Sequence, residues 1–210
     1  MLTLAVDTAA EIGSIALASA DGVIAEVRFE APAGSGQVLF GEIEGLLARQ
    51  RVRLADIELY AAASGPGSFT GVRVGLAAVK GLAEVAGKPA VGVSSLVALA
   101  AWGSAELRAP LIDAKRGEVF AALFDREGVE LIAESVLPFR AFAELVGERS
   151  VEYVSAGFDP GVAFTHAPAE LAGMVARLAM ARLATGERCD PASIEANYVR
   201  RSDAEVFWKA

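Results

Sequence analysis

The chain has 210 residues, of which 54% are hydrophobic and 22% are charged, and its formal net charge is −8. This composition provides a sizeable core and excludes a disordered chain. Affinity for nucleic acids comes largely from Lys and Arg side chains that neutralise phosphates. The acidic balance therefore disfavours a protein that binds RNA by itself, and any action on RNA is expected to go through a basic partner.

The cysteine content and the start of the chain bear on its location. Cys189 is the single cysteine, which excludes an intrachain disulfide and fits a cytosolic protein. Asp7 interrupts the first apolar run too early for a signal peptide. The apolar-rich stretch 72–86 contains Arg73, Lys80 and Glu84, which argues against a membrane span. We therefore expect a cytoplasmic protein without a membrane partner.

The first half of the chain predicts three strands followed by helices and further strands. Strands are expected at 2–7, 13–18 and 23–30, the last two joined by a hairpin at Asp21-Gly22. Apolar residues at i, i+4, i+7 and i+8 from Leu39 predict an amphipathic helix that ends near Gln50. The elements expected next are a strand at 58–64, a glycine-rich loop at 65–71, a helix at 72–86, a strand at 90–93 and a short helix capped by Ser94.

The second half repeats this order. Its expected elements are strands at 110–114, 118–124 and 129–136, a helix at 139–146, a strand at 153–156 and a helix at 168–184. The first strand of each half ends in an aspartate, Asp7 or Asp113. Such self-similarity indicates a duplicated unit.

The order of elements within each unit predicts the fold class. Three antiparallel strands followed by a helix and a strand are typical of a ribonuclease-H-like unit. The sequence therefore predicts an α/β protein with two tandem ribonuclease-H-like lobes, at 1–104 and 105–210. This is the arrangement of the actin, chaperone and sugar-kinase ATPase superfold. A single doubly wound sheet is the alternative, and the consecutive hairpins disfavour it.

In that superfold a nucleotide lies between the lobes, beside the first strands. The Asp7 carboxylate could hold a hydrated Mg²⁺ ion, and the Thr8 hydroxyl could reach a phosphate. Alternatively, both side chains satisfy amides of their own turn. Ala9 stands where a phosphate-wrapping turn would normally carry glycine. We therefore predict a degenerate nucleotide site with no required cofactor and, at most, weak or partner-dependent binding of ATP or ADP.

The string GPGSFTGVRVG at 65–75 is a second candidate site for an anion. Gly65 and Gly67 allow positive φ and a close approach of the backbone to a neighbour. Ser68 and Thr70 supply hydroxyls, and the following helix presents free N–H groups. The alternative is a tight strand-to-helix turn that packs against the other lobe. The chemistry of these residues alone does not decide between the two interpretations.

The same string, in a chain that opens LAVDTA, resembles the TsaB (YeaZ) family. Further matches are IDAKRGEVF at 112–120 and NYVR at 197–200, in the family's order, so the resemblance covers almost the whole chain. It implies a non-catalytic subunit of the complex that forms N6-threonylcarbamoyladenosine in tRNA. The implied partners are a TsaD-like transferase, which this subunit activates as a heterodimer, and a TsaE-like ATPase. The resemblance also implies a homodimer when the protein is alone, and contact with tRNA only through the complex.

The residue content agrees with a subunit that performs no chemistry. His166 is the single histidine, too few for a histidine metal site, so we predict no metal and interpret His166 as a surface-loop residue. The chain has no GxSxG nucleophile motif, and no catalytic residue is predicted. One rival interpretation is an active ATP-dependent kinase or ATPase that uses Asp7, Asp113 and the glycine loop. A metallopeptidase is another rival, and the histidine count disfavours it.

The helix at 72–86 is apolar over most of its circumference. One stripe consists of Gly71, Gly75, Ala78 and Leu82, and the neighbouring stripe consists of Val72, Leu76, Val79 and Ala83. Because the sheet of its own lobe covers one stripe, the other requires a partner or a further element of the same chain. We predict a partner interface formed with the helix at 37–50, through Leu39, Ile43, Leu46, Gly75, Leu76, Ala78, Val79 and Leu82.

Overall fold

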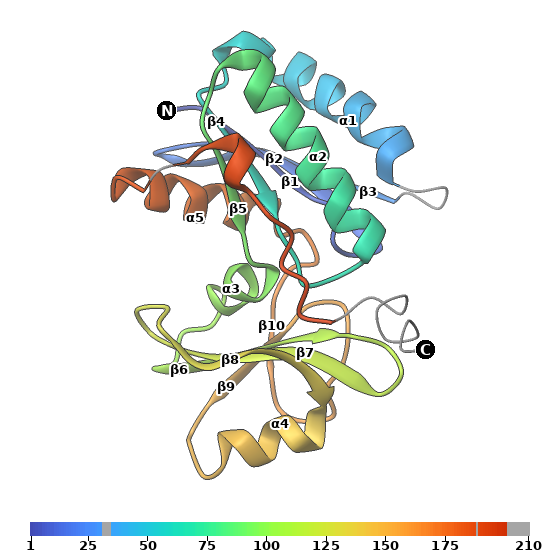
Figure 1. The fold of residues 1–210 in the computed structure, drawn as a ribbon, viewed down its shortest axis with the longest axis vertical. Helices are drawn as coiled ribbons and strands as arrows, with labels where there is room; N and C mark the ends of the chain where they lie inside the picture. The colour runs from blue at the N-terminus through green and yellow to red at the C-terminus, as the bar shows by residue number, and fades with distance from the viewer. Residues whose placement is uncertain (31–34, 188, 201–210) are drawn as a thin grey trace, which may run out of the picture.

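The computed structural model describes residues 1–30, 35–187 and 189–200, and these form two five-stranded sheets, one above the other in Figure 1. The upper sheet consists of β1 (Thr3–Asp7), β2 (Ile12–Ser19), β3 (Gly22–Glu30), β4 (Leu59–Ala63) and β5 (Ala90–Val93). Its order is β3-β2-β1-β4-β5. The strands β1, β2 and β3 are antiparallel, and β4 and β5 continue the sheet in parallel.

The lower sheet repeats this topology. It consists of β6 (Leu107–Asp113), β7 (Glu118–Asp125), β8 (Glu130–Pro138), β9 (Glu152–Ser155) and β10 (Thr165–His166), in the order β10-β9-β6-β7-β8. The predicted α/β duplication is confirmed. The short strand β10 was not predicted, because two residues carry no alternating pattern. The interpretation of His166 as a loop residue was wrong, although its side chain is exposed.

The helices have the following bounds: α1 (Ser35–Gln50), α2 (Phe69–Ala86), α3 (Ser95–Ala100), α4 (Phe139–Val146) and α5 (Ala172–Ala184), with short 3₁₀ turns η1 (Leu54–Asp56) and η2 (Pro191–Ser193). The helix α2 begins three residues earlier than predicted because the Ser68 hydroxyl caps it, accepting from the Gly71 amide. Part of the expected glycine loop is therefore helical. Within the described residues, no helix combines the length and the apolar character needed to cross a bilayer.

Each sheet is covered on both faces, and one cover in each case comes from the other half of the chain (Figure 1). The helices α1 and α2 pack on one face of the upper sheet, and α5 packs on β1, β2 and β4 from the opposite face. In the lower lobe α4 packs on β7 and β8, and α3 packs on β6 and β7. The helices α3 and α5 are thus exchanged between the halves.

This exchange corrects the predicted division of the chain at 104/105. The helix α3, from the first half, buries Leu96 against Phe120 and Phe124 of the lower sheet. The helix α5, from the second half, buries Val175 and Ala179 in the core of the upper lobe. The sequence shows that both helices are apolar, but the same apolar face fits either sheet, so the pattern does not say which sheet each helix covers.

A cavity in α3 should therefore weaken both lobes. Leu96 is fully buried, and Leu96→Ala should lower the free energy of unfolding by about 2–5 kcal/mol. Because the exchanged helices tie the lobes together, amide hydrogen exchange should accelerate in β1 as well as in β7. Leu145 on α4 is 54% exposed, so Leu145→Ala is the control and should change stability by less than about 0.5 kcal/mol. Loss of protection confined to the lower sheet would contradict the coupling.

Candidate functional site

The turn after β1 meets the start of α2, and this contact uses the polar groups predicted for phosphate binding. The Thr8 hydroxyl donates to the carbonyl oxygen of Gly71 at 2.7 Å. The Ser68 amide donates to the carbonyl oxygen of Ala9 at 2.7 Å. One Asp7 carboxylate oxygen accepts from the Ala9 amide at 2.9 Å. Both side chains are buried. Asp7 bonds to an amide of its own turn, as the alternative interpretation predicts, whereas Thr8 bonds to a carbonyl group of α2, which neither interpretation predicts.

Three glycines allow this contact. A Cβ atom on Gly71 would lie 1.9 Å from the carbonyl oxygen of Thr8, and one on Gly67 would lie 2.4 Å from that of Ala9. A Cβ atom on Gly75 would lie 2.5 Å from the Thr8 hydroxyl oxygen. We call this contact of residues 7–9 with Gly67, Gly71 and Gly75 the glycine joint. The glycine string thus packs tightly, as one interpretation predicts, but against the turn of its own lobe and not against the other lobe.

The remaining residues predicted for the nucleotide site point in different directions. Gly65 has a φ of +91°, and its carbonyl oxygen accepts from the Ser95 amide at 2.7 Å. Ser68 and Thr70 are exposed at the start of α2. Of the six predicted residues, Asp7, Thr8 and Gly67 thus belong to the glycine joint, and Gly65, Ser68 and Thr70 lie beside it in the glycine string.

Burial controls the charge of Asp7. Removal from water raises the pKa of this carboxyl from 3.8 to about 6, the Ala9 amide partly offsets the increase, and the charge of Glu26 adds to it. Burial likewise raises the pKa of Glu26, whose carboxylate accepts from the Gly173 amide at the start of α5 at 2.9 Å. Asp7 is thus buried, whereas Glu26 stays exposed and bonds to the first turn of α5.

The second aspartate of the repeat is also engaged by the protein. Asp113 accepts from the Lys115 amide at 2.7 Å, and its other oxygen lies 3.1 Å from the Lys115 ammonium. Burial alone would raise the pKa of Asp113, but the bonds from Lys115 hold it below its usual value. The same ammonium lies 3.7 Å from the Glu11 carboxylate of the upper lobe. The two turns that would face a nucleotide are thus joined by a salt bridge.

The described residues contain no cluster of three or more potential metal ligands. The single histidine, His166, packs its ring 4.3 Å from that of Phe164 on the exposed edge strand β10. The His166 ring thus has an aromatic neighbour, and it belongs to no group of three potential metal ligands among the described residues.

The predicted partner interface lies mostly inside the protein. Seven of its eight residues are buried and Leu82 is partly buried. The outward stripe of α2 is covered by the same chain, since α2 packs beside α1 on one side and contacts η2 on the other. The prediction of an outward apolar stripe on α2 was wrong, because the sequence does not reveal that the C-terminal segment returns to this helix.

An exposed apolar groove nevertheless lies between α1, the segment that follows α1, and Leu82 of α2. It has a volume of about 350 Å³ and is lined by Phe40, Ile43, Glu44, Leu47, Ala48, Val52, Leu54 and Leu82. Phe40 is 55% exposed and Leu54 40%. We call this surface the α1–α2 groove. The residue that the sequence analysis missed is Phe40, which directly follows Leu39 but was not included in the predicted stripe.

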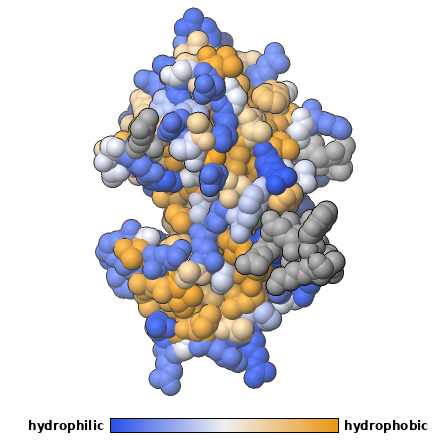
Figure 2. Space-filling model, viewed as in Figure 1, coloured by the Kyte–Doolittle hydropathy of each residue, from blue (hydrophilic) through white to orange (hydrophobic). Residues whose placement is uncertain are grey.

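Apolar surface is also present on the lower lobe, around β7 and β8 (Figure 2). Val129 and Leu131 are each at least half exposed there, at the start of the edge strand β8. The α1–α2 groove differs from this surface because it is concave.

Comparisons with known proteins agree with the fold. A family model described as TsaD, tRNA N6-adenosine threonylcarbamoyltransferase, matches residues 31–189. The tRNA threonylcarbamoyladenosine biosynthesis protein TsaB of Escherichia coli (strain K12) is 37% identical over 169 residues, which are 75% of this chain and 71% of that protein. TsaB of Bacillus subtilis (strain 168) is 36% identical over 66% of this chain and 60% of its own length. YeaZ from Pseudomonas aeruginosa superimposes with a TM-score of 0.76 at 28% identity, covering 94% of this chain and 99% of that one.

The glycine joint predicts opposite effects for two substitutions on α2. Gly71→Ala should destabilise the protein by about 3 kcal/mol or more, because the added methyl group overlaps the backbone of Thr8. Gly81 is exposed on the same helix, and no atom lies within 4 Å of the position that an added methyl group would take, so Gly81→Ala should stabilise it by about 0.5–1 kcal/mol. Urea unfolding measures both. Equal effects of the two substitutions would contradict the joint.

The raised pKa of Asp7 predicts a pH dependence of stability. Between pH 3.8 and about 6 the folded protein binds more protons than the unfolded chain, so stability falls as the pH rises through this window. The loss should reach about 3 kcal/mol at neutral pH. Asp7→Asn keeps an oxygen for the Ala9 amide without the charge, and should be more stable than the wild type at pH 7.5. Urea unfolding at several pH values, with the exposed Glu148→Gln as control, checks this; an unchanged pH profile in Asp7→Asn would refute it.

Proposed function

The chain belongs to the TsaB (YeaZ) family, and we propose on this basis that it is a non-catalytic subunit in the formation of threonylcarbamoyladenosine in tRNA. Its role would be to bind and activate a TsaD-like transferase. The proposal that the subunit is non-catalytic rests on the glycine joint. There the start of α2 bonds to polar groups of the turn after β1, which would face a phosphate in a nucleotide-binding relative of this fold. A nucleotide would have to displace Gly71 to reach Thr8.

An active kinase or ATPase has less support. Such an enzyme would need both aspartates near a magnesium nucleotide, whereas Asp7 is buried under α2 and α5 and Asp113 is bonded to Lys115. We propose that the protein requires no cofactor, and that any binding of ATP or ADP is weak or depends on the partner.

We propose that the transferase contacts the α1–α2 groove. Large exposed apolar and aromatic side chains in concave surfaces are typical centres of protein interfaces, and Phe40 and Leu54 provide them here. The TsaD family model matches this chain over 31–189, so the partner would present similar helices. In the absence of the transferase, a second copy of the chain could use the same groove, which accounts for the homodimer that the family resemblance implies.

The net charge of the chain and its family are the basis for what we propose about tRNA and the TsaE-like ATPase. With a net charge of −8, the protein would reach tRNA only through the complex. A TsaE-like ATPase would join the pair. We propose the cytoplasm as the place of assembly, since tRNA is modified there.

The groove and the function can be tested together by reconstitution with the TsaD-like transferase of the same organism. The wild-type chain should support formation of the modified nucleoside, followed by mass spectrometry of digested tRNA. Phe40→Glu should remain folded because its side chain is largely exposed, but it should weaken binding of the transferase by about 30-fold or more, as expected for a central interface residue. Isothermal titration calorimetry measures this loss.

The matched control is Leu145→Glu, which places the same charge on an equally exposed apolar residue of the lower lobe. It should bind and support modification like the wild type. Equal binding by both variants would move the interface away from the groove. Full modification without any form of this chain would refute the proposed function.

A further inference from the structure

The C-terminal part of the described chain passes from the upper to the lower lobe, at the front of the molecule in Figure 1. We call residues 194–200 the interlobe strap. Its first residue, Ile194, packs on Gly92 of β5, where an added Cβ atom would lie 2.7 Å from the Ile194 side chain. Its last residue, Arg200, donates to the carbonyl oxygen of Ala114, in the turn after β6, at 2.8 Å. The strap thus touches the edge of one sheet and the turn of the other.

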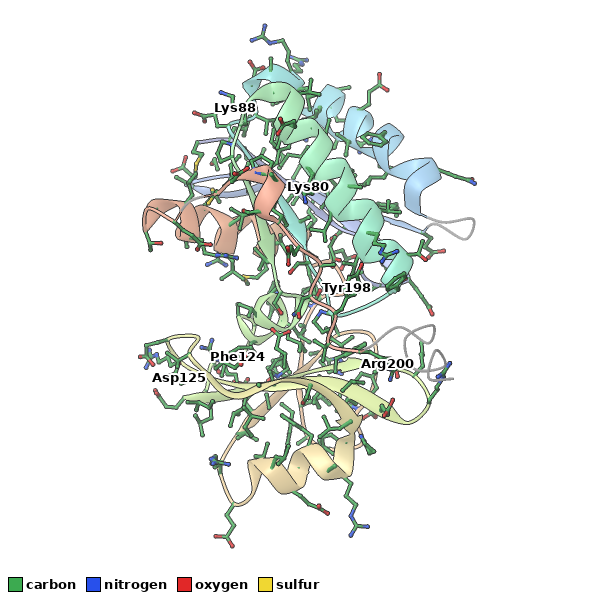
Figure 3. The ribbon with its side chains drawn as sticks, in the orientation of Figure 1. Lys80, Lys88, Phe124, Asp125, Tyr198 and Arg200 are labelled. Carbon is green, nitrogen blue, oxygen red and sulfur yellow. The ribbon has the colours of Figure 1, made fainter. Side chains whose placement is uncertain are left out.

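The strap is attached to the upper lobe along α2. The Lys80 ammonium donates to the carbonyl oxygen of Ile194 at 2.8 Å. The Tyr198 hydroxyl accepts from the Arg73 guanidinium at 2.6 Å, and its ring lies 5.2 Å from that of Phe69 (Figure 3). Phe69 and Arg73 belong to the glycine string, so this string holds the strap as well as the turn after β1.

The strap is attached to the lower lobe by polar and apolar contacts. Val199 packs with the cluster that contains Leu96 and Phe120. The Arg200 guanidinium bonds to the Glu118 carboxylate, and both side chains are about two-thirds buried. Because ion pairs shielded from water are screened less than exposed ones, this bond holds the end of the strap on β7.

Asn197 connects both lobes at one residue. Its amide donates to the carbonyl oxygen of Ser64 at 2.8 Å, and its side-chain amide donates to the Glu134 carboxylate of β8. The same carboxylate accepts from the hydroxyl of Ser94, which caps α3, at 2.5 Å. Glu134 is therefore the point where the strap, the exchanged helix and the lower sheet meet.

Without the strap, the lobes would be joined at a narrow region and by the exposed ion pair of Lys115 with Glu11, which solvent screens. The chain passes between them before α3 and again before α5, and Leu99 of α3 packs with Leu171 in one cluster. Two crossings that lie close together leave a hinge, and lobes joined in this way move relative to each other by default. The strap extends the attachment from this region to the turn after β6. We infer that the interlobe strap is a lock that fixes the angle between the two lobes.

The test measures the distance between the lobes in the full-length chain. Spin labels are placed at two exposed positions, through Ala77→Cys on α2 and Glu148→Cys after α4, in a Cys189→Ser background. Double electron–electron resonance should give one narrow distance distribution. Asn197→Ala combined with Arg200→Ala removes both side chains that reach the lower lobe by hydrogen bonds, and should broaden and shift the distribution. Circular dichroism confirms that the variant is folded.

Glu195→Ala is the matched control, because Glu195 is an exposed residue of the same strap with no bond to the lower lobe among those described. It should keep the narrow distribution. The single substitutions Asn197→Ala and Arg200→Ala should each give a smaller broadening, and they decide the question if the double variant does not fold. An unchanged distribution in the folded variants would show that the exchanged helices alone fix the lobes. The measurement uses no partner and is independent of the proposed function.

Discussion

The exchange of α3 and α5 between the two halves is the packing constraint on which the rest of this structure depends. Each sheet has two apolar faces, and each half of the chain supplies the helices for one face of its own sheet and for one face of the other. Because the core of each lobe contains a helix from the opposite half, neither half has a complete core by itself. The two lobes are therefore expected to be stable only together, although their topologies repeat.

The turns that follow β1 and β6 lie where this superfold binds a nucleotide, and both are engaged by groups of the protein itself. Thr8 bonds to Gly71, Lys115 joins Asp113 to Glu11, and Asn197 bonds to Glu134. The first contact lies within the upper lobe, and the other two connect segments of different lobes.

The surface left for a partner is correspondingly narrow. Both stripes of α2 are covered, by the sheet on one side and by α1 and η2 on the others, so α2 contributes mainly its partly buried Leu82 to the α1–α2 groove. The exposed apolar groups come from α1 and η1, namely Phe40 and Leu54. The proposed interface therefore lies mainly on α1, and α2 packs beside α1.

The sequence by itself determined the duplicated topology, because strand and helix periods and the hairpin at Asp21-Gly22 are local signals. It also determined the family, through the glycine string and the two shorter motifs. Only the tertiary structure decided that α3 and α5 are exchanged, that the glycines meet residues 7–9 and that residues 194–200 return to α2. These contacts join residues far apart in the chain, as with Asn197 and Glu134, and an apolar or polar pattern shows that a residue needs a partner without showing which one.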